Sequence, residues 1–448
     1  MCAKVEVRGI VRMGICLSML LFAGGSQAFP KIQTWKTSQG MPVFYMETKG
    51  LPMVDIRVVF DAGSSRDGDD FGVAHLTSAL LDSGAGVWGA DELSARLEGV
   101  GALLSTGAGR DSAYVSLRTL TDPEKLKVSL ETFQEVITHP TFAEKDFDRE
   151  KNRALMAIKQ QAEDPEELAE LGYMKALYGE HPYAHAPEGT LETLSKLSRE
   201  QTQSFFRRYY TRGNGIVAIV GDLDRQAAER VADELVKGMG VAERASPIAD
   251  PVKPHGQVIL KEFPSAQTHI FAGQLGMRIN DPDYFPLYVG NHILGGSGLV
   301  SKIMEEVREK RGYAYSAYSY FFPMKSLGPF QIGLQTKNGQ ADDALKVAID
   351  TLKGFVEQGP SEAELVAAKR NIIGGFVLRL DSNSKLVGEI ANIGYFQRPL
   401  DYLDTFQEKV NAVTRQDILR LFGQRIQPND LVVMKVGGVK RQSGDTQK

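Results

Sequence analysis

The chain has 448 residues, of which 42% are hydrophobic and 24% are charged, and its formal net charge is −4. A chain of this length and apolar content can bury large hydrophobic cores and form two or more domains. A mildly acidic protein with scattered charges is not expected to bind nucleic acid.

The first 28 residues predict a cleaved signal peptide. A basic start is followed by a short apolar run at 13–22 and by small residues that end at Ala28. The basic residues are Lys4, Arg8 and Arg12. The apolar run is short for a membrane span, although an uncleaved anchor is the alternative. We therefore expect a periplasmic protein that has no membrane anchor after cleavage.

Both cysteines, Cys2 and Cys16, lie in this leader. The leader also carries two net positive charges, so its removal changes the net charge from −4 to −6. The mature chain would then have no disulfide, no thiol nucleophile and no cysteine zinc ligand.

The remaining sequence predicts two halves, 29–236 and 257–448. Segment 237–256 contains three Pro and three Gly without a sustained hydrophobic period, which is typical of a linker. The same order of elements is expected twice. In the first half we expect strands at 41–47 and 54–60, a helix at 72–82, a strand at 113–117, helices at 123–137, 143–162 and 166–178, and a strand at 215–220. In the second half we expect strands at 257–261 and 268–273, a helix at 285–294, a strand at 330–334, helices at 340–357 and 361–379, and a strand at 430–436.

This repetition indicates an internal duplication. Strands that are grouped with helix pairs favour an α+β fold of two homologous halves, each a mostly antiparallel sheet with helices packed on it.

The expected helix at 72–82 carries part of a zinc-peptidase pattern. In H-x-x-E-H, two histidines one helical turn apart bind zinc and the glutamate serves as general base. Here His75 takes the first position, Ser78 the glutamate position and Ala79 the second histidine position. A single imidazole cannot hold catalytic zinc, which takes three protein ligands. Considered alone, such a histidine is more often a structural residue of an apolar helix.

Four segments together resemble the pitrilysin-type (M16) zinc peptidases, in particular their short secreted bacterial members. They are Gly72-Val-Ala-His75, the helix around Asp148–Ile158, His181-Pro-Tyr183 with the strand that ends at Gly221-Asp222, and the run from Asn291 through Gly298 and Arg308 to Tyr315. The resemblance covers nearly all of the mature chain, and it implies the M16/LuxS-like metallohydrolase fold. It also implies a third zinc ligand, a glutamate, at the position of Met156. The degenerate zinc-site positions are therefore His75, Ser78, Ala79 and Met156, and we expect no metal in this chain.

The resemblance further implies that Arg308 and Tyr315, seven residues apart, contact the substrate main chain and the oxyanion. The residues fit this role, because a guanidinium presents five N–H donors and a tyrosine hydroxyl adds another. We expect an apolar helix stripe to seat Arg308 (Leu299, Val300, Ile303, Met304 and Val307), and we expect Tyr313 and Tyr315 to share a strand face. The alternative is that Arg308 only pairs with Glu305, one turn back.

Three further features of the sequence indicate a function less strongly. His181 and His185 have metal-pair spacing, but Pro182 between them indicates a loop. The Gly295-Gly296-Ser-Gly298 run lacks the Lys-Ser/Thr of a phosphate loop, and is expected to form a tight turn that lines the substrate cavity. Segment 100–114 matches an edge strand that the family offers to peptides, although a solvent-facing turn fits as well.

The sequence therefore predicts the non-catalytic subunit of a split M16-type peptidase. The expected partner is an M16 subunit that carries H-x-x-E-H and zinc, in a heterodimer that acts on peptides. A scaffold or peptide-binding protein without a role in hydrolysis is the second possibility, and an independent enzyme with other ligands is the third.

Overall fold

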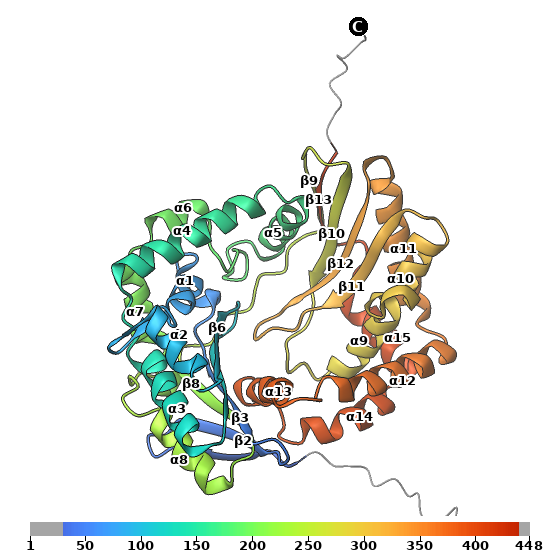
Figure 1. Cartoon of the computed structure of the whole chain (residues 1–448). Helices are drawn as coiled ribbons and strands as arrows, with labels where there is room; N and C mark the ends of the chain where they lie inside the picture. The colour runs from blue at the N-terminus through green and yellow to red at the C-terminus, as the bar shows by residue number, and fades with distance from the viewer. Residues whose placement is uncertain (1–29, 439–448) are drawn as a thin grey trace, which may run out of the picture.

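The computed structural model describes residues 30–438, which form two α+β halves that face one another (Figure 1). The predicted signal peptide lies outside the described residues. Within them, no helix is long and apolar enough to cross a membrane.

The first half is built on a six-stranded sheet with the order β1-β2-β8-β3-β7-β6. Neighbouring strands are antiparallel except for the parallel pair β2 and β8. The strands are β1 (Gln33–Lys36), β2 (Pro42–Glu47), β3 (Met53–Phe60), β6 (Leu103–Ala108), β7 (Ala113–Leu120) and β8 (Gly215–Gly221). A small hairpin pairs β4 (Gly84–Ala85) with β5 (Trp88–Gly89). Because β6 lies at the sheet edge, segment 100–114 contains an edge strand.

The helices of the first half follow the amphipathic periods of the sequence. They are α1 (Val73–Leu80), α2 (Ala90–Glu98), α3 (Pro123–Thr138), α4 (Glu144–Gln161), α5 (Pro165–Tyr178), α6 (Leu191–Lys196), α7 (Arg199–Tyr209) and α8 (Arg225–Leu235). Both α3 and α5 begin with an aspartate cap followed by proline, which fixes their starts. Helices α1, α2, α3 and α8 pack on the first sheet, and the shared core includes Phe60, Phe133 and Leu80.

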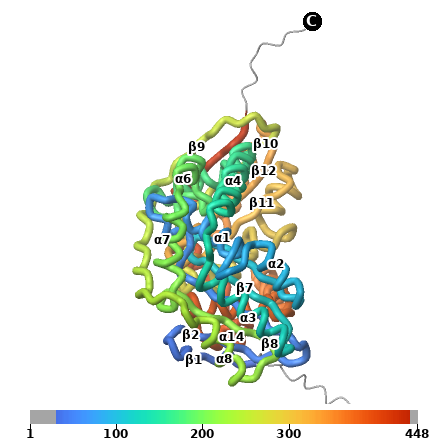
Figure 2. The backbone as a smooth tube through the Cα atoms, turned by 60° about the vertical axis from the view of Figure 1, so that its left-hand side comes forward, coloured from blue at the N-terminus to red at the C-terminus, as the bar shows by residue number. Residues whose placement is uncertain are grey.

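The second half repeats the plan with a five-stranded sheet in the order β11-β12-β10-β13-β9. Its strands are β9 (Gln257–Lys261), β10 (Gln267–Leu275), β11 (Ala314–Phe321), β12 (Pro329–Lys337) and β13 (Val432–Val436), antiparallel except for β13 with β9. Its helices are α9 (Tyr284–Asn291), α10 (Lys302–Met304), α11 (Ala341–Gln358), α12 (Glu362–Leu378), α13 (Asn383–Tyr395), α14 (Tyr402–Ala412) and α15 (Arg415–Arg425). Two π-helical turns, His292–Gly296 (η3) and Glu305–Glu309 (η5), follow α9 and α10. Figure 2 shows β1 and β2 at one end of the molecule and β9 and β10 at the other.

One helix of each half packs on the sheet of the other half. Helix α5 packs on β13 and β10, where Tyr173 stacks on Phe271 at 6.1 Å between ring centroids. Helix α13 packs on β8 and β3. Its apolar side chains share a core with residues of the first sheet such as Val59 and Ala218. The two halves are therefore joined by continuous apolar packing as well as by the chain.

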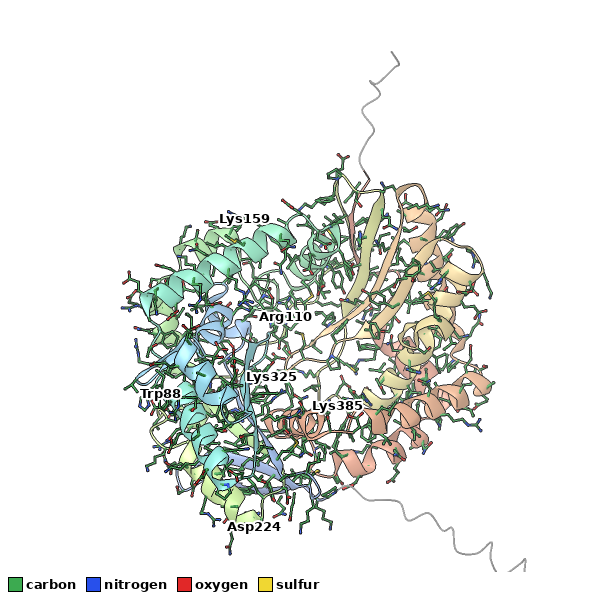
Figure 3. The ribbon with its side chains drawn as sticks, in the orientation of Figure 1. Trp88, Arg110, Lys159, Asp224, Lys325 and Lys385 are labelled. Carbon is green, nitrogen blue, oxygen red and sulfur yellow. The ribbon has the colours of Figure 1, made fainter. Side chains whose placement is uncertain are left out.

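A buried polar cluster also joins the halves, near the centre of the molecule, where Lys325 reaches the first half from the loop between β11 and β12 (Figure 3). The Asp61 carboxylate, which is 1% exposed, pairs with Lys325 and accepts two hydrogen bonds of 2.8 Å from Arg66. Asp111 accepts from the backbone N–H of Lys325 at 2.8 Å and from the Tyr183 hydroxyl. Because one cation meets a buried carboxylate across the interface, this contact fixes how the halves meet.

The fold class predicted from the sequence is confirmed: both sheets are mostly antiparallel and both carry helices. The segment predicted as a linker, 237–256, contains no helix or strand among the described residues.

Candidate functional site

Arg308 lies on the π-helical turn η5, whose inward residue Val307 is fully buried. A π-turn widens the helix by one residue and often marks a functional position. The Arg308 Nη1 donates a hydrogen bond to the carbonyl oxygen of Tyr315 at 3.2 Å, and its Nε lies 3.5 Å from a Glu309 carboxylate oxygen. Glu305 pairs with Lys310 instead, so the alternative of an Arg308–Glu305 pair is wrong.

Tyr315 lies at an irregularity of β11. Ala314 pairs with Thr336 and Ser316 pairs with Gln335, so Tyr315 is left without a partner on β12 as in a β-bulge. Its side chain is 77% exposed, and the Arg308 guanidinium carbon lies 4.9 Å from the centroid of its ring. Tyr313 precedes the strand and packs against the core. The two tyrosines therefore do not alternate along one regular strand as expected, although both line the same cavity.

Arg308 and Tyr315 line one open cavity of about 470 Å³. Its other polar residues include Gln267, Gln335 and Lys337. Of the expected apolar stripe, Ile303 and Val307 are buried, whereas Leu299 and Val300 are 61% and 81% exposed and do not seat the helix. The cavity thus presents a guanidinium and a phenol side by side to solvent, which suits hydrogen bonding to a peptide main chain or an oxyanion.

The degenerate zinc motif lies in the first half, at the start of α1. The helix begins after Gly72, whose φ of 97° is left-handed and favours glycine. The Asp67 carboxylate accepts hydrogen bonds from the N–H groups of Gly72 and Ala74 at 2.8 and 3.0 Å, and so holds the first turn. The next residue, His75, faces a cavity of about 330 Å³ between α1, β6 and α4.

Two of the four degenerate positions, His75 and Ala79, meet in this cavity. Ser78 does not line it: the side chain is 2% exposed, and its hydroxyl lies near the buried hydroxyl of Tyr210, on the side of α1 that packs against α7. The glutamate position of the pattern is therefore occupied by a residue of the helix interface.

Met156 does not face this cavity either. Its side chain is 70% exposed, and the α4 residues that line the cavity are Glu150, Arg153, Ala154 and Ala157. Adjacent helical residues point about 100° apart. The structure therefore places Ala157, one residue further on, opposite His75 and Ala79. An alanine methyl group cannot bind metal, so position 157 supplies no carboxylate ligand.

The donors present do not fit a catalytic zinc ion. Among the described residues, no group of three or more His, Cys, Asp and Glu side chains is arranged to hold a metal. His75 shares its cavity with Asp82 and Glu150, but Glu150 lies 3.1 Å from Arg149 and 3.7 Å from Arg153. Burial, followed by the neighbouring Glu150, raises the pKa of Asp82.

His181 and His185 have separate protein partners. The His181 Nε2 lies 2.9 Å from the carbonyl oxygen of Ala249, and its Nδ1 accepts a hydrogen bond from the N–H of Tyr183. His185 stacks on Phe71 with 4.2 Å between ring centroids. Both imidazoles therefore hold loops in place.

The glycine run has three separate roles. A Cβ on Gly295 would lie 2.3 Å from the backbone nitrogen of Ser319, so only glycine allows η3 to approach β11 this closely. Gly296 lines a separate cavity of about 210 Å³ beside His292. Gly298 has a φ of 63° and begins the following 3₁₀ turn, Gly298–Val300. Of these three glycines, only Gly296 lines one of the cavities described here.

Sequence reasoning did not single out Ala157, Asp82 and Glu150 of the first cavity. It also gave no role to the aromatic alternation of Tyr318, Tyr320 and Phe322 on β11 and directly after it, or to the run of glutamates at the start of α5. Both of the latter patterns are visible in the sequence. The function of these aromatic residues and glutamates depends on which residues lie next to them in the folded chain.

Comparisons with known proteins agree with this geometry. Residues 43–190 match the family described as insulinase (peptidase family M16), and residues 196–372 match the family described as peptidase M16 inactive domain. The chain is similar to a solved structure of a peptidase M16 inactive domain from Pseudomonas fluorescens, with 37% identity, a TM-score of 0.88 and coverage of 91% of this chain and 98% of that one.

Curated relatives carry two kinds of name. An uncharacterized zinc protease of Streptomyces coelicolor is 26% identical over 78% of this chain and 76% of its own length. A protein of Helicobacter pylori named non-peptidase homolog YmxG is 26% identical over 90% of this chain and 93% of its own length. The two matched family regions, the shared fold and the degenerate motif agree with one another, and the chain belongs to peptidase family M16.

Proposed function

We propose that this chain is the non-catalytic subunit of a two-chain M16 peptidase, and that it supplies Arg308 and Tyr315 to a peptide held at the zinc of its partner. One observation carries the proposal: the first cavity lacks the metal ligands, whereas the second cavity contains the Arg/Tyr pair. The first has alanines at 79 and 157, where metal ligands would stand, while the second keeps Arg308 and Tyr315 together and open to solvent.

The chemistry of the retained pair supports this role. Peptide hydrolysis passes through a tetrahedral oxyanion, which positioned donors stabilise. The guanidinium of Arg308 has five N–H groups. One donates to Tyr315 and Nε lies near Glu309, so donors remain for a substrate. The exposed Tyr315 hydroxyl adds one more donor. Neither side chain can activate water without a metal or a base, so the chain needs a partner that brings both.

The partner would be an M16 subunit with an intact H-x-x-E-H motif, which supplies zinc and the general base. A structure from Candida albicans, complex III2, contains a chain with the same fold at 17% identity and a TM-score of 0.76. That similarity shows the fold alone, but it supports the idea that such chains work as subunits. The basic and apolar leader at 1–28 further supports a periplasmic location, where peptide substrates are available.

Purification tests the proposal directly. The full-length precursor gene is expressed in its own host with an affinity tag at the C-terminus, and proteins that copurify are identified. We expect an M16 chain that carries H-x-x-E-H in stoichiometric amount, and no peptidase activity from this chain alone. Zinc-dependent hydrolysis by this chain alone would contradict the proposal.

A scaffold role is the second candidate, and one observation favours it: the Arg308 side chain already contacts Tyr315 and Glu309 within its own chain. The name non-peptidase homolog for the Helicobacter pylori relative is compatible with it. Full activity of a reconstituted complex that carries Arg308→Ala together with Tyr315→Ala would favour the scaffold role.

A further inference from the structure

The second sheet has an inner face, the side on which α5 packs. Helix α5 packs on β10 and β13 on this side. Further toward the sheet edge, Tyr320 of β11 and Phe322, just after the end of β11, remain 39% and 44% exposed. An apolar surface that stays open inside a two-half molecule is a candidate binding surface.

Three aromatic side chains form a row along this open part. The ring centroids of Tyr318 and Tyr320 are 5.4 Å apart, and those of Tyr320 and Phe322 are 5.8 Å apart. The Tyr318 ring lies across β12 at Gly333, where a Cβ would come within 2.4 Å of it. Glycine at this position therefore lets the ring lie flat on the sheet. Open aromatic faces attract cationic side chains.

Acidic side chains on α5 border this row. Glu166, Glu167 and Glu170 are exposed at the start of the helix, and Glu188 lies nearby. Burial raises the pKa of Glu167 and of Glu170, and repulsion by neighbouring carboxylates raises both further, while Arg110 lowers the pKa of Glu170. The group thus carries a local excess of negative charge.

The Arg110 guanidinium attracts Glu170 and Glu188, and this single cation offsets only part of the charge of the four carboxylates. The buried Arg110, near the centre of the molecule in Figure 3, donates its hydrogen bonds to the carbonyl oxygens of Tyr183 and His185. Among the described residues, the ion pair found for the three α5 glutamates joins Glu166 to His269 at 3.8 Å. Burial lowers the pKa of His269, which favours its neutral form.

Strand register places the glutamates beside the aromatic row. His269 of β10 pairs with Gln335 of β12, and Gln335 pairs with Ser316 of β11, two residues before Tyr318 on the same face. Glu166 lies over this line of residues because it contacts His269. Burial, and then Glu166 and Glu170, raise the pKa of Tyr318 to about 12.

We propose that the aromatic row of Tyr318, Tyr320 and Phe322 and the glutamates of α5 form a binding surface for the lysine or arginine side chains of an extended peptide. A cationic head group would lie between carboxylates and open aromatic rings, and its aliphatic stem would cover the exposed ring edges. This inference deepens the proposed function by naming the class of peptide, yet it requires only this chain.

Direct binding tests the proposal without any partner. Fluorescein-labelled 12-residue peptides that differ only in four central residues (Lys, Gln or Glu) are titrated with the purified chain, and anisotropy is measured. We expect the lysine peptide to bind about tenfold more tightly than the glutamine peptide at low salt, and this preference to shrink at 0.3 M NaCl. Equal affinities, a preference for the glutamate peptide, or no binding of any peptide would overturn the proposal.

A matched pair of variants locates the surface. The first changes Glu166, Glu167 and Glu170 to Gln, and the control changes three exposed glutamates elsewhere, Glu124, Glu144 and Glu357, to Gln. We expect the first to lose most of the tenfold preference and the control, which has the same net charge, to keep it. Tyr320→Leu with Phe322→Leu should weaken the lysine peptide several-fold. An equal effect of both triple variants would contradict the assignment.

The assay also separates this inference from the proposed function. If basic peptides show no preference while the reconstituted pair still requires Arg308, only the binding surface is refuted. If the preference is present but no zinc-bearing partner is found, only the split-site proposal is refuted.

Discussion

Arg308 and Tyr315 form one structural unit: the guanidinium of the first lies 4.9 Å from the ring of the second and donates to its carbonyl oxygen at 3.2 Å. The π-turn presents the arginine and the bulge presents the tyrosine, so two local irregularities bring them together. Such irregularities cost local hydrogen bonding and are often found at functional sites.

Tyr315→Phe tests the role of the hydroxyl. In the reconstituted pair we expect kcat to fall by about 10²–10³, the usual effect of removing one oxyanion donor. KM should change little, because this hydrogen bond strengthens mainly in the transition state. The ring remains, so the thermal unfolding of the chain should be unchanged.

Tyr313→Phe is the control for this variant, because Tyr313 lies two residues away, lines the same cavity and packs against the core. We expect it to leave kcat within about twofold of the original value. Equal losses from both substitutions, or a pure KM effect of Tyr315→Phe, would argue for simple lining of the cavity.

Because Ala157 of α4, and not Met156, faces His75 and Ala79, the structure predicts which substitutions restore zinc binding. Ala79→His with Ala157→Glu would place three ligands around one cavity together with His75. Ala79→His with Met156→Glu is the matched control, since position 156 points away. Calorimetric titration should show clearly tighter zinc binding for the first variant. Tight binding by the unmodified chain, or equal binding by both variants, would show that the site is misassigned.

Gly295→Ala tests the contact between η3 and β11. The added methyl group would lie 2.3 Å from the Ser319 nitrogen, so β11 must shift, and overpacking of this kind costs about 1–3 kcal/mol of unfolding free energy. The control is Gly375→Ala on α12, where nothing lies within 4 Å and alanine should stabilise the helix by about 0.5–1 kcal/mol. Denaturant unfolding of both variants checks the signs. A neutral Gly295→Ala would show that the approach of the backbones is looser than described.

Asp67 predicts a pH dependence of stability. Burial raises the pKa of its carboxyl to about 8, despite the hydrogen bonds from Gly72 and Ala74. A folded pKa above the unfolded value means that the folded state holds the proton more tightly. The stability that this group contributes is therefore full below about pH 4 and is lost as pH rises toward 8.

Asp67→Asn removes this titration, so the stability difference between the original chain and the variant should shrink from pH 5 to pH 8. Thermal melts at several pH values measure this difference. His185, at 4.0 Å from Asp67, is present in both proteins, and exposed Asp69→Asn is the control. A difference that grows with pH would mean that the carboxylate is the favoured form in the folded protein.

Much of the fold could be predicted from local patterns. The helices α3, α4 and α5 and the strands β3, β8 and β9 lie within one or two residues of their predicted ranges, because periodicity and caps are local signals. The exchange of α5 and α13 between the halves was not predicted. An apolar helix face predicts that the helix packs on another element, but it does not identify the sheet on which the helix packs.

The site was less predictable, for geometric reasons. The resemblance places the third ligand position at Met156, and a shift of one residue along a helix turns the side chain by about 100°. The alternation of 313–320 predicts a regular strand, but a bulge at Tyr315 cannot be recognised from alternation. The apolar residues Leu299 and Val300 fit a helix stripe, yet they lie in a separate 3₁₀ turn, Gly298–Val300, before α10 begins.

The most direct test of the split site is steady-state hydrolysis by the reconstituted pair, with this chain either unmodified or carrying both Arg308→Ala and Tyr315→Ala. Complex formation is verified by size-exclusion chromatography in each case. The account predicts no activity from this chain alone, activity for the unmodified pair, and a loss of about 10³-fold or more in kcat for the intact complex with the double variant. Full activity of that complex would contradict it.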